Sequence, residues 1–128
     1  MPETTFRGEQ QNDGPRQASF TPSYLGVLAM ITEAGMTQIE VAKVVNASPR
    51  TVQNWASGAN TPRGKNAERL LDLHTIIDVL RDSYTPEGIQ IWLRSRNRNL
   101  EMQRPIDLLL SGDVNVVLAE ARWVAGGM

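Results

Sequence analysis

The sequence predicts an all-α protein, and three observations support this prediction. After residue 20, apolar residues recur three or four positions apart, which is the spacing of one face of an α-helix. Three of these segments begin with Ser or Thr followed directly by Pro, a pair that is typical of a helix start. No run of Val, Ile and Thr alternates with polar residues as a half-buried strand would require.

The composition limits the classes of protein to which the chain can belong. It has 128 residues, a formal net charge of −1 and no cysteine, which excludes disulfides and thiolate metal sites. Its length fits one domain, or two small helical units that share a core. No apolar stretch approaches the roughly 18 residues that a membrane helix needs, and the N-terminus lacks an apolar secretion signal. We therefore expect a cytoplasmic protein with no membrane partner.

The N-terminal residues divide into a polar tail and a first helix. Residues 1–20 are rich in Gln, Gly, Thr and charged side chains, and we expect them to be a disordered tail. Thr21 and Pro22 predict the start of a helix that ends near Gly35. Its apolar residues are Leu25, Leu28, Met30 and Ile31.

Residues 37–58 predict two short helices joined by a tight turn. Thr37 and Glu40 have the spacing of a capping box at the first helix, and Ser48-Pro49 predicts the start of the second. Gly58 is placed to end the second helix in a left-handed conformation. The residues expected to face inward are Ile39, Ala42 and Val45 on the first helix and Val52 and Trp55 on the second. This arrangement is a helix-turn-helix, which presents its second helix to a DNA major groove.

The outer face of the second helix carries side chains that can bind DNA. Arg can bind guanine, Gln and Asn can bind adenine, and hydroxyl groups suit phosphates. The residues expected to face the groove are Pro49, Arg50, Gln53 and Asn54, with Thr51 near its edge, and the candidate phosphate-binding residues are Arg63 and Lys65. Residues 37–65 have a local net charge of +3 in an otherwise slightly acidic chain, as DNA binding requires. The alternative is an ordinary solvent-exposed helix whose polar residues bind nothing.

A Pro- and Gly-containing loop, residues 59–65, leads to the longest periodic segment, about residues 66–82. The apolar stripe of this predicted helix consists of Leu70, Leu73, Ile77 and Leu80, widened by Ile76 and Val79. A stripe of this width predicts self-association through α-helical packing. The alternative is that the neighbouring helices cover it completely.

Three shorter helices are expected after residue 84. Thr85-Pro86 predicts a helix with Ile89, Ile91, Trp92 and Leu93, and residues 94–100 are polar and turn-like. Pro105 predicts a short helix that ends at Leu110, before Ser111-Gly112. Asp113 can cap a last helix that runs toward Trp123. The arginines of residues 94–98 form either a solvated loop or an auxiliary phosphate-binding patch.

No residue pattern predicts catalysis, a metal site or a cofactor site. His74 is the single histidine, and metal sites need at least two or three convergent ligands. Residues 58–65 superficially resemble a phosphate-binding loop, but they contain one residue too many, and Asn66 stands where Ser or Thr should bind Mg²⁺. We therefore expect a protein that is not an enzyme.

Two segments resemble known families. Residues 37–58 are similar to the helix-turn-helix of Xre/Cro-type repressors, and Asn46 occupies the turn position where glycine is common. Residues 91–112 resemble the toxin-binding domain of Xre/MbcA/ParS-type antitoxins. The matching residues are Trp92, Asn97, Leu100, Pro105, Asp107, Leu108, Leu109 and Gly112. Arg96 replaces a proline of that pattern, and Glu101-Met102 replace two glycines. Together the resemblance covers about residues 25–125.

The resemblance implies an antitoxin whose partner is a RES-domain toxin, an enzyme that consumes NAD⁺. It divides the chain into a tail (1–20), an Xre-like helix-turn-helix domain (21–64), and a helical linker with a toxin-binding domain (65–128). The residues expected to contact the toxin are Arg94, Asn97, Arg98, Arg104, Arg122, Trp123, Val124 and Met128. We also expect operator DNA as a partner, and a homodimer or a hetero-oligomer with the toxin.

Two rival interpretations remain open at this point. The chain could be a stand-alone helix-turn-helix repressor whose C-terminal helices only dimerise or bind a ligand. Alternatively, it could be a protein-binding adaptor in which the helix-turn-helix serves only for packing. A RES-type toxin gene beside this one would favour the antitoxin interpretation over both rivals. Trp123 either closes the protein's own core or anchors a partner.

Overall fold

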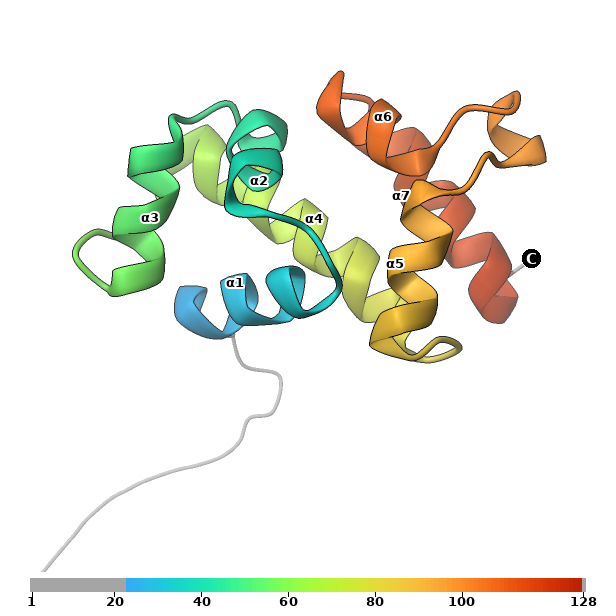
Figure 1. Ribbon diagram of the computed structural model, residues 1–128, viewed down its shortest axis with the longest axis horizontal. Coiled ribbons are helices and arrows are strands. Elements are labelled where there is room, and N and C mark those ends of the chain that lie inside the picture. The colour runs from blue at the N-terminus through green and yellow to red at the C-terminus, as the bar shows by residue number, and fades with distance from the viewer. Residues whose placement is uncertain (1–22, 128) are drawn as a thin grey trace, which may run out of the picture.

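The computed structural model describes residues 23–127, and within this range the chain consists of helices and the loops that join them. The N-terminal helices are α1 (Tyr24–Glu33), α2 (Gln38–Val45) and α3 (Pro49–Ser57). The C-terminal elements are α5 (Pro86–Arg94), η1 (Arg98–Leu100), α6 (Pro105–Leu110), α7 (Val114–Arg122) and a final wide turn, η2 (Trp123–Gly127). The long helix α4 (Gly64–Arg81) lies between the two groups and contacts both (Figure 1). The predicted all-α fold with an N-terminal helix-turn-helix is confirmed.

The helix starts follow local capping chemistry. Thr37 Oγ1 accepts a hydrogen bond from the backbone N–H of Glu40, and Glu40 Oε1 accepts one from the N–H of Thr37, both at 3.0 Å. This is the predicted capping box. Ser48 and Thr85 cap α3 and α5, each directly before the proline at the first helical position.

The first helix begins later than expected. Ser23 Oγ accepts a hydrogen bond from the N–H of Gly26 at 3.1 Å, and α1 therefore begins at Tyr24. The predicted start at Thr21-Pro22 lies outside the described residues, as does the predicted tail, residues 1–20. The long helix also differs from its prediction, because α4 begins at Gly64 and includes Lys65, which was assigned to the preceding loop.

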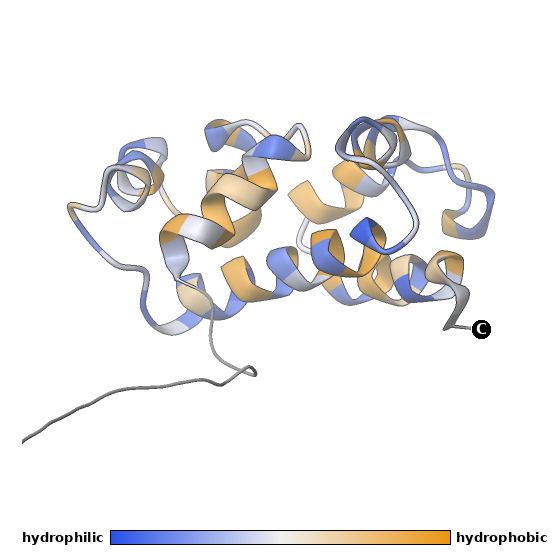
Figure 2. Ribbon diagram, turned by 90° about the horizontal axis from the view of Figure 1, so that it is seen from below, coloured by the Kyte–Doolittle hydropathy of each residue, from blue (hydrophilic) through white to orange (hydrophobic). Residues whose placement is uncertain are grey.

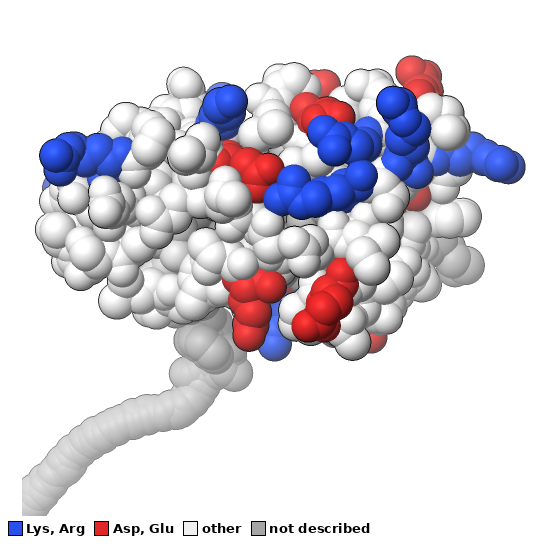
Figure 3. Space-filling view, in the orientation of Figure 1, with Lys and Arg blue, Asp and Glu red and all other residues white. Residues whose placement is uncertain are grey.

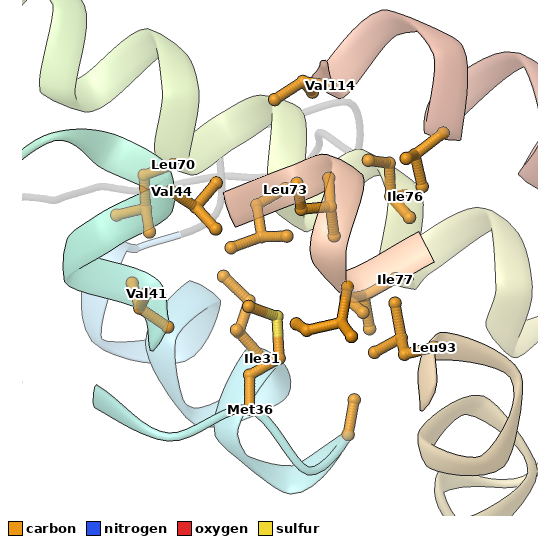
Figure 4. Close-up of a cluster of buried hydrophobic side chains, with 14 of the residues drawn as sticks. Ile31, Met36, Val41, Val44, Leu70, Leu73, Ile76, Ile77, Leu93 and Val114 are labelled. Atoms are coloured by element: carbon orange, nitrogen blue, oxygen red, sulfur yellow. The ribbon is translucent and has the colours of Figure 1, made fainter. Parts of the chain in front are cut away.

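The buried side chains of both ends of the molecule form one hydrophobic core. Ile31 and Met36 lie beside Val41 and Val44 of α2, and Leu93 of α5 joins them from the other end (Figure 4). Colouring by hydropathy shows the hydrophobic residues gathered on the helix faces that turn toward the interior (Figure 2). The division into residues 21–64 and 65–128 stays a prediction, whereas the core is shared between these two parts.

The apolar stripe of α4 faces this core, and all of its members are buried except Val79, which is half-buried. Its members Leu70, Leu73, Ile76, Ile77 and Leu80 each have 0% of their surface exposed. The stripe therefore offers little free surface for self-association, which stays a prediction, because α1 and α2 cover it on one side and α5 and α7 on the other.

Ile39 is the one predicted inward-facing residue of the helix-turn-helix that points outward. It is 58% exposed, whereas Val41, Ala42, Val44 and Val45 are buried. The apolar residues of α2 outnumber the positions on one helix face. The pair Val41-Val44 and the pair Ala42-Val45 fill the inner surface, which leaves Ile39 in solvent.

Candidate functional site

The first turn of α3 is capped by Ser48 and presents polar residues to solvent. Ser48 Oγ accepts a hydrogen bond from the N–H of Thr51 at 3.1 Å and lies 2.8 Å from Thr51 Oγ1. Pro49, Arg50 and Gln53 are exposed. Thr51 and Asn54 are half-buried, and the Thr51 hydroxyl is already bound to Ser48. Arg50 and Gln53 are therefore the side chains with the greatest reach toward a groove.

The turn before α3 is fixed from both sides. Asn46 has a φ of 63°, so the left-handed residue expected at this position is present although it is not glycine. Asn66 Nδ2 donates a hydrogen bond to the carbonyl oxygen of Val45 at 2.8 Å. This bond satisfies a carbonyl at the end of α2 and ties the turn to α4. This bond could not be predicted from the sequence, because the two residues are far apart in the chain.

The candidate phosphate-binding residues lie at the start of α4. Arg63 is exposed and occupies the position before the first helical residue. The Lys65 side chain is 84% exposed, and its Nζ lies 4.0 Å from Glu68 Oε1, so this ion pair is loose and fully open to solvent. Pairs of this kind contribute little to stability and are easily exchanged for another anion.

Positive charge is not confined to the helix-turn-helix. Figure 3 shows Lys and Arg side chains along the upper half of the molecule, from the α3 end to the α6 end. Three of the arginines between residues 94 and 104 form hydrogen bonds within the chain, namely Arg94, Arg96 and Arg104. Arg104 donates two hydrogen bonds to Asp107, at 2.8 and 2.9 Å, and its guanidinium holds the pKa of that carboxyl below its usual value.

Arg94 is likewise bound within the chain, at the junction between the two ends. Its guanidinium donates to both carboxylate oxygens of Glu40, at 3.0 and 2.9 Å, and to the carbonyl oxygen of Gly35 at 2.8 Å. The hydrogen bond from Arg94 lowers the pKa of Glu40. Of the arginines expected to contact a partner, Arg98 and Arg122 are exposed and form no ion pair with a residue of the described part.

The loop after α5 contains two residues in the left-handed backbone conformation that glycine favours, although neither is glycine. Glu101 and Met102 have φ angles of 57° and 66°, in the left-handed region, at the positions where the antitoxin pattern has two glycines. Asn97 Oδ1 accepts a hydrogen bond from the N–H of Asn99 at 2.8 Å, and Asn97 also pairs with Gln103 through the backbone. Arg96, which replaces the proline of the pattern, donates to the carbonyl oxygen of Met102 at 3.1 Å. These polar contacts hold the loop in shape.

The C-terminal face contains a depression of about 600 Å³ between η1 and α7. Its lining residues are Asn99, Leu100, Val116, Ala119, Glu120 and Trp123. Trp123 is 57% exposed, so it does not close the protein's own core, whereas Val124 is half-buried and packs against that core. Met128 lies outside the described residues.

Of the residues predicted to contact a partner, the structure brings only Trp123 to this depression. Asn99, Val116 and Glu120 line it as well and were not predicted. The spacing of Val116, Glu120 and Trp123 along the last helix could have revealed them, because residues four and three apart share one helix face. Their mixed polar and apolar character concealed the pattern.

Neither a metal centre nor a membrane span is present in residues 23–127. No three His, Asp or Glu side chains of this range are grouped so that they could hold a metal ion. His74 is half-buried on α4. None of the described helices combines the length and the hydrophobicity needed to cross a bilayer.

Comparison with known proteins gives concordant similarities. A helix-turn-helix family model matches residues 28–74. The mycobacterial cidal antitoxins MbcA of Mycobacterium tuberculosis and Mycobacterium bovis are each 35% identical over 102 residues, which cover 80% of this chain and 90% of the relative. Among solved structures, a chain of the M. tuberculosis MbcT–MbcA toxin–antitoxin complex matches with a TM-score of 0.68 and 33% identity, covering 85% of this chain and 98% of that one.

Proposed function

Because the chain belongs to the family of the mycobacterial cidal antitoxin MbcA, we propose that it is the antitoxin of a type II pair and neutralises a toxin encoded beside it. The observation that carries the proposal is the extent of the relationship. The similarity covers 80% of the chain, so it extends beyond the helix-turn-helix into the C-terminal half. A stand-alone repressor would need to share only the DNA-binding part.

The proposed toxin is a RES-domain enzyme that consumes NAD⁺, and this chain contributes a surface to the complex but no catalytic group. A surface of this kind inhibits by filling the substrate site of its partner. The exposed Trp123 at the end of α7 is suited to such an anchoring role, since aromatic side chains dominate binding energy at protein interfaces. The segment proposed to insert comprises Trp123, Val124 and Met128.

The proposed second activity is repression of the chain's own operon through α3. Arg50, Gln53 and Asn54 would read base edges, with Pro49 and Thr51 near the backbone of the DNA, and Arg63 and Lys65 would neutralise phosphates. The exposure of Arg50 and Gln53 and the capped first turn of α3 support this assignment.

Neutralisation is tested by expressing the adjacent gene with and without this chain. We expect cell growth and intracellular NAD⁺ to fall with the adjacent gene alone, and both to recover when the chain is coexpressed. The control is the Arg50→Ala/Asn54→Ala variant, which alters only the DNA-binding face and should rescue as well as the wild type. Failure of the two proteins to copurify, together with no rescue, would contradict the proposal.

DNA binding is tested by mobility shift on the chain's own promoter, with and without the toxin. Arg50→Ala is expected to weaken binding by about 1–3 kcal/mol and to relax the sequence preference. Lys65→Ala should weaken binding to every sequence and flatten the salt dependence. Arg81→Ala, at the far end of α4, serves as the control. Unchanged binding by the Arg50→Ala/Asn54→Ala variant would eliminate α3 as the recognition helix.

A further inference from the structure

A second depression adjoins the one between η1 and α7. It has a volume of about 330 Å³ and shares Asn99, Leu100 and Val116 with the first. It adds the acidic residues Glu101 and Asp113. The two depressions together are called the C-terminal groove below.

The C-terminal groove is acidic, although arginines are frequent in this part of the sequence. Its ionisable lining residues are Glu101, Asp113 and Glu120, and neither depression has a Lys or Arg among its lining residues. The groove therefore favours a cationic occupant and disfavours a phosphate or another anion.

Glu120 is the deepest of the three carboxylates and is only half satisfied. Its residue is 8% exposed, and its Oε2 accepts a hydrogen bond from Asn99 Nδ2 at 3.0 Å. Its Oε1 forms no hydrogen bond or ion pair with any residue in the range 23–127. A mostly buried carboxylate with a single protein donor loses part of its hydration on folding, which costs free energy. A donor supplied by a partner would recover that cost.

Apolar side chains frame this carboxylate. Val116 is 50% exposed and Trp123 is 57% exposed, and both line the same depression as Glu120. An Arg or Lys side chain has an apolar stem that packs on such residues and a charged head that binds a carboxylate. An indole face attracts the same cation. The combination of aromatic, aliphatic and acidic groups thus matches one kind of side chain.

We propose that the C-terminal groove receives an arginine or lysine side chain of the toxin, which donates to Glu120 and packs between Val116 and Trp123. This inference rests on the proposed function and names the chemistry of the partner's contact. The sequence predicts that arginines of this chain contact the toxin. In this inference the charges are the other way round, because the antitoxin supplies the carboxylate and the toxin supplies the cation.

The test measures the affinity of the full chain for the purified product of the adjacent gene. Glu120→Gln removes the charge but keeps an oxygen that can accept from Asn99, and we expect its Kd to rise at least about tenfold. Glu33→Gln, which removes an exposed negative charge at the end of α1, is the matched control and should bind like the wild type.

A second variant covers the case in which Glu120→Gln is poorly folded. Glu101→Gln/Asp113→Asn neutralises the two exposed carboxylates, and Asp113 makes no side-chain capping bond that would be lost. We expect weaker toxin binding and a smaller salt dependence than in the wild type. Both groove variants should keep wild-type affinity for promoter DNA.

The outcomes separate this inference from the proposed function. Wild-type toxin affinity in both folded groove variants overturns the inference and leaves the antitoxin assignment intact. Absence of binding by the wild-type chain contradicts the antitoxin assignment itself. A change in the oligomeric state of the chain alone, seen by light scattering with toxin affinity unaltered, assigns the groove to a second copy and also overturns the inference.

Discussion

Arg94 joins the two ends of the molecule through a single guanidinium. It lies at the end of α5 and binds Glu40 of α2 and the carbonyl oxygen of Gly35 after α1. The Glu40 and Arg94 side chains are 20% and 34% exposed, so the pair is partly withdrawn from water. Hydrogen bonds between charged groups in such positions are stronger than those of exposed ion pairs. Arg94 is therefore a structural link between the helix-turn-helix and the C-terminal helices.

Replacing Arg94 by methionine is expected to lower the free energy of unfolding by about 2 kcal/mol, after allowance for partial solvent screening. Urea denaturation at pH 7 measures this loss. Arg98→Met, an exposed arginine on η1, is the control and should change stability by less than about 0.5 kcal/mol. Equal stability of the two variants would mean that the Arg94 contacts do not hold the ends together.

The same pair predicts a pH dependence. Hydrogen bonding from Arg94 lowers the pKa of Glu40 from its ordinary value of 4.5. A lowered folded-state pKa stabilises the protein above the ordinary pKa, and this contribution is lost as the pH falls through the lowered value. The stability difference between the wild type and Glu40→Gln should therefore be constant from pH 7 to about 5 and shrink below 4.5. Urea denaturation across this range checks it. A difference that grows on acidification would contradict the assigned cause.

Glu101 and Met102 adopt backbone conformations that favour glycine. Left-handed φ values cost an ordinary L-residue roughly 1–2 kcal/mol. Glycine avoids this cost in the folded state, but part of the gain is lost because glycine raises the conformational entropy of the unfolded chain. Met102 is 53% exposed and loses little packing when shortened. Met102→Gly is thus expected to stabilise the protein by about 0.5–1 kcal/mol in thermal or chemical denaturation.

The control for this substitution is Gln103→Gly, the next residue, whose φ is not left-handed. It should be destabilising, because glycine adds freedom to the unfolded chain without relieving strain. A loss of stability in Met102→Gly of the same size as in Gln103→Gly would show that the left-handed conformation at Met102 carries no cost.

At the scale of whole elements, the sequence predicted those helices that carry their own start and stop residues. The starts of α2, α3, α5 and α6 follow from Thr37, Ser48, Thr85 and Pro105, whose capping partners or ring constraints are local. The groups that depend on tertiary contacts were not predictable. The hydrogen bonds from Asn66 to Val45 and from Arg94 to Glu40 join segments that are far apart in the chain. The outward position of Ile39 depends on which face of α2 is covered by α4.

The two candidate interfaces also differ in whether they could be predicted from the sequence. The outer face of α3 could be predicted, since it is what remains once Val52 and Trp55 are assigned to the core. The C-terminal groove could not, because η1 and α7 are separated in sequence and meet only through the Asn99–Glu120 hydrogen bond and the packing around it. Whether the predicted residues bind their partners stays a prediction.

The capping of α3 is testable at this scale. Ser48→Ala removes the oxygen that accepts from the Thr51 N–H and should lower the free energy of unfolding by about 1 kcal/mol. Ser48→Asp should retain most of the stability, since aspartate is an equally good cap. Ser57→Ala, at the exposed end of the same helix, is the control. If Ser48→Ala is as stable as Ser57→Ala in urea, the cap does not hold the start of α3.

For the molecule as a whole, the shared core predicts one cooperative unfolding transition. Ile77→Ala on α4 is expected to lower the free energy of unfolding by about 2–5 kcal/mol, because its side chain is fully buried. Two single-tryptophan variants, one retaining Trp55 in α3 and one retaining Trp123, report on opposite ends. Ile77→Ala introduced into each should shift both fluorescence midpoints in urea by the same amount. Unequal shifts of the two midpoints would show two independently folding domains.

The position of α4 between the two ends also has a consequence for the genetics of the protein. Substitutions at its buried positions, such as Leu73 and Ile77, weaken both ends together, because both pack on the same side chains. A random screen should therefore recover core alleles that lose both proposed activities, operator repression and toxin neutralisation, at once. Alleles that separate the two phenotypes should map to residues that line the proposed interfaces, on α3 for repression and around Glu120 and Trp123 for neutralisation.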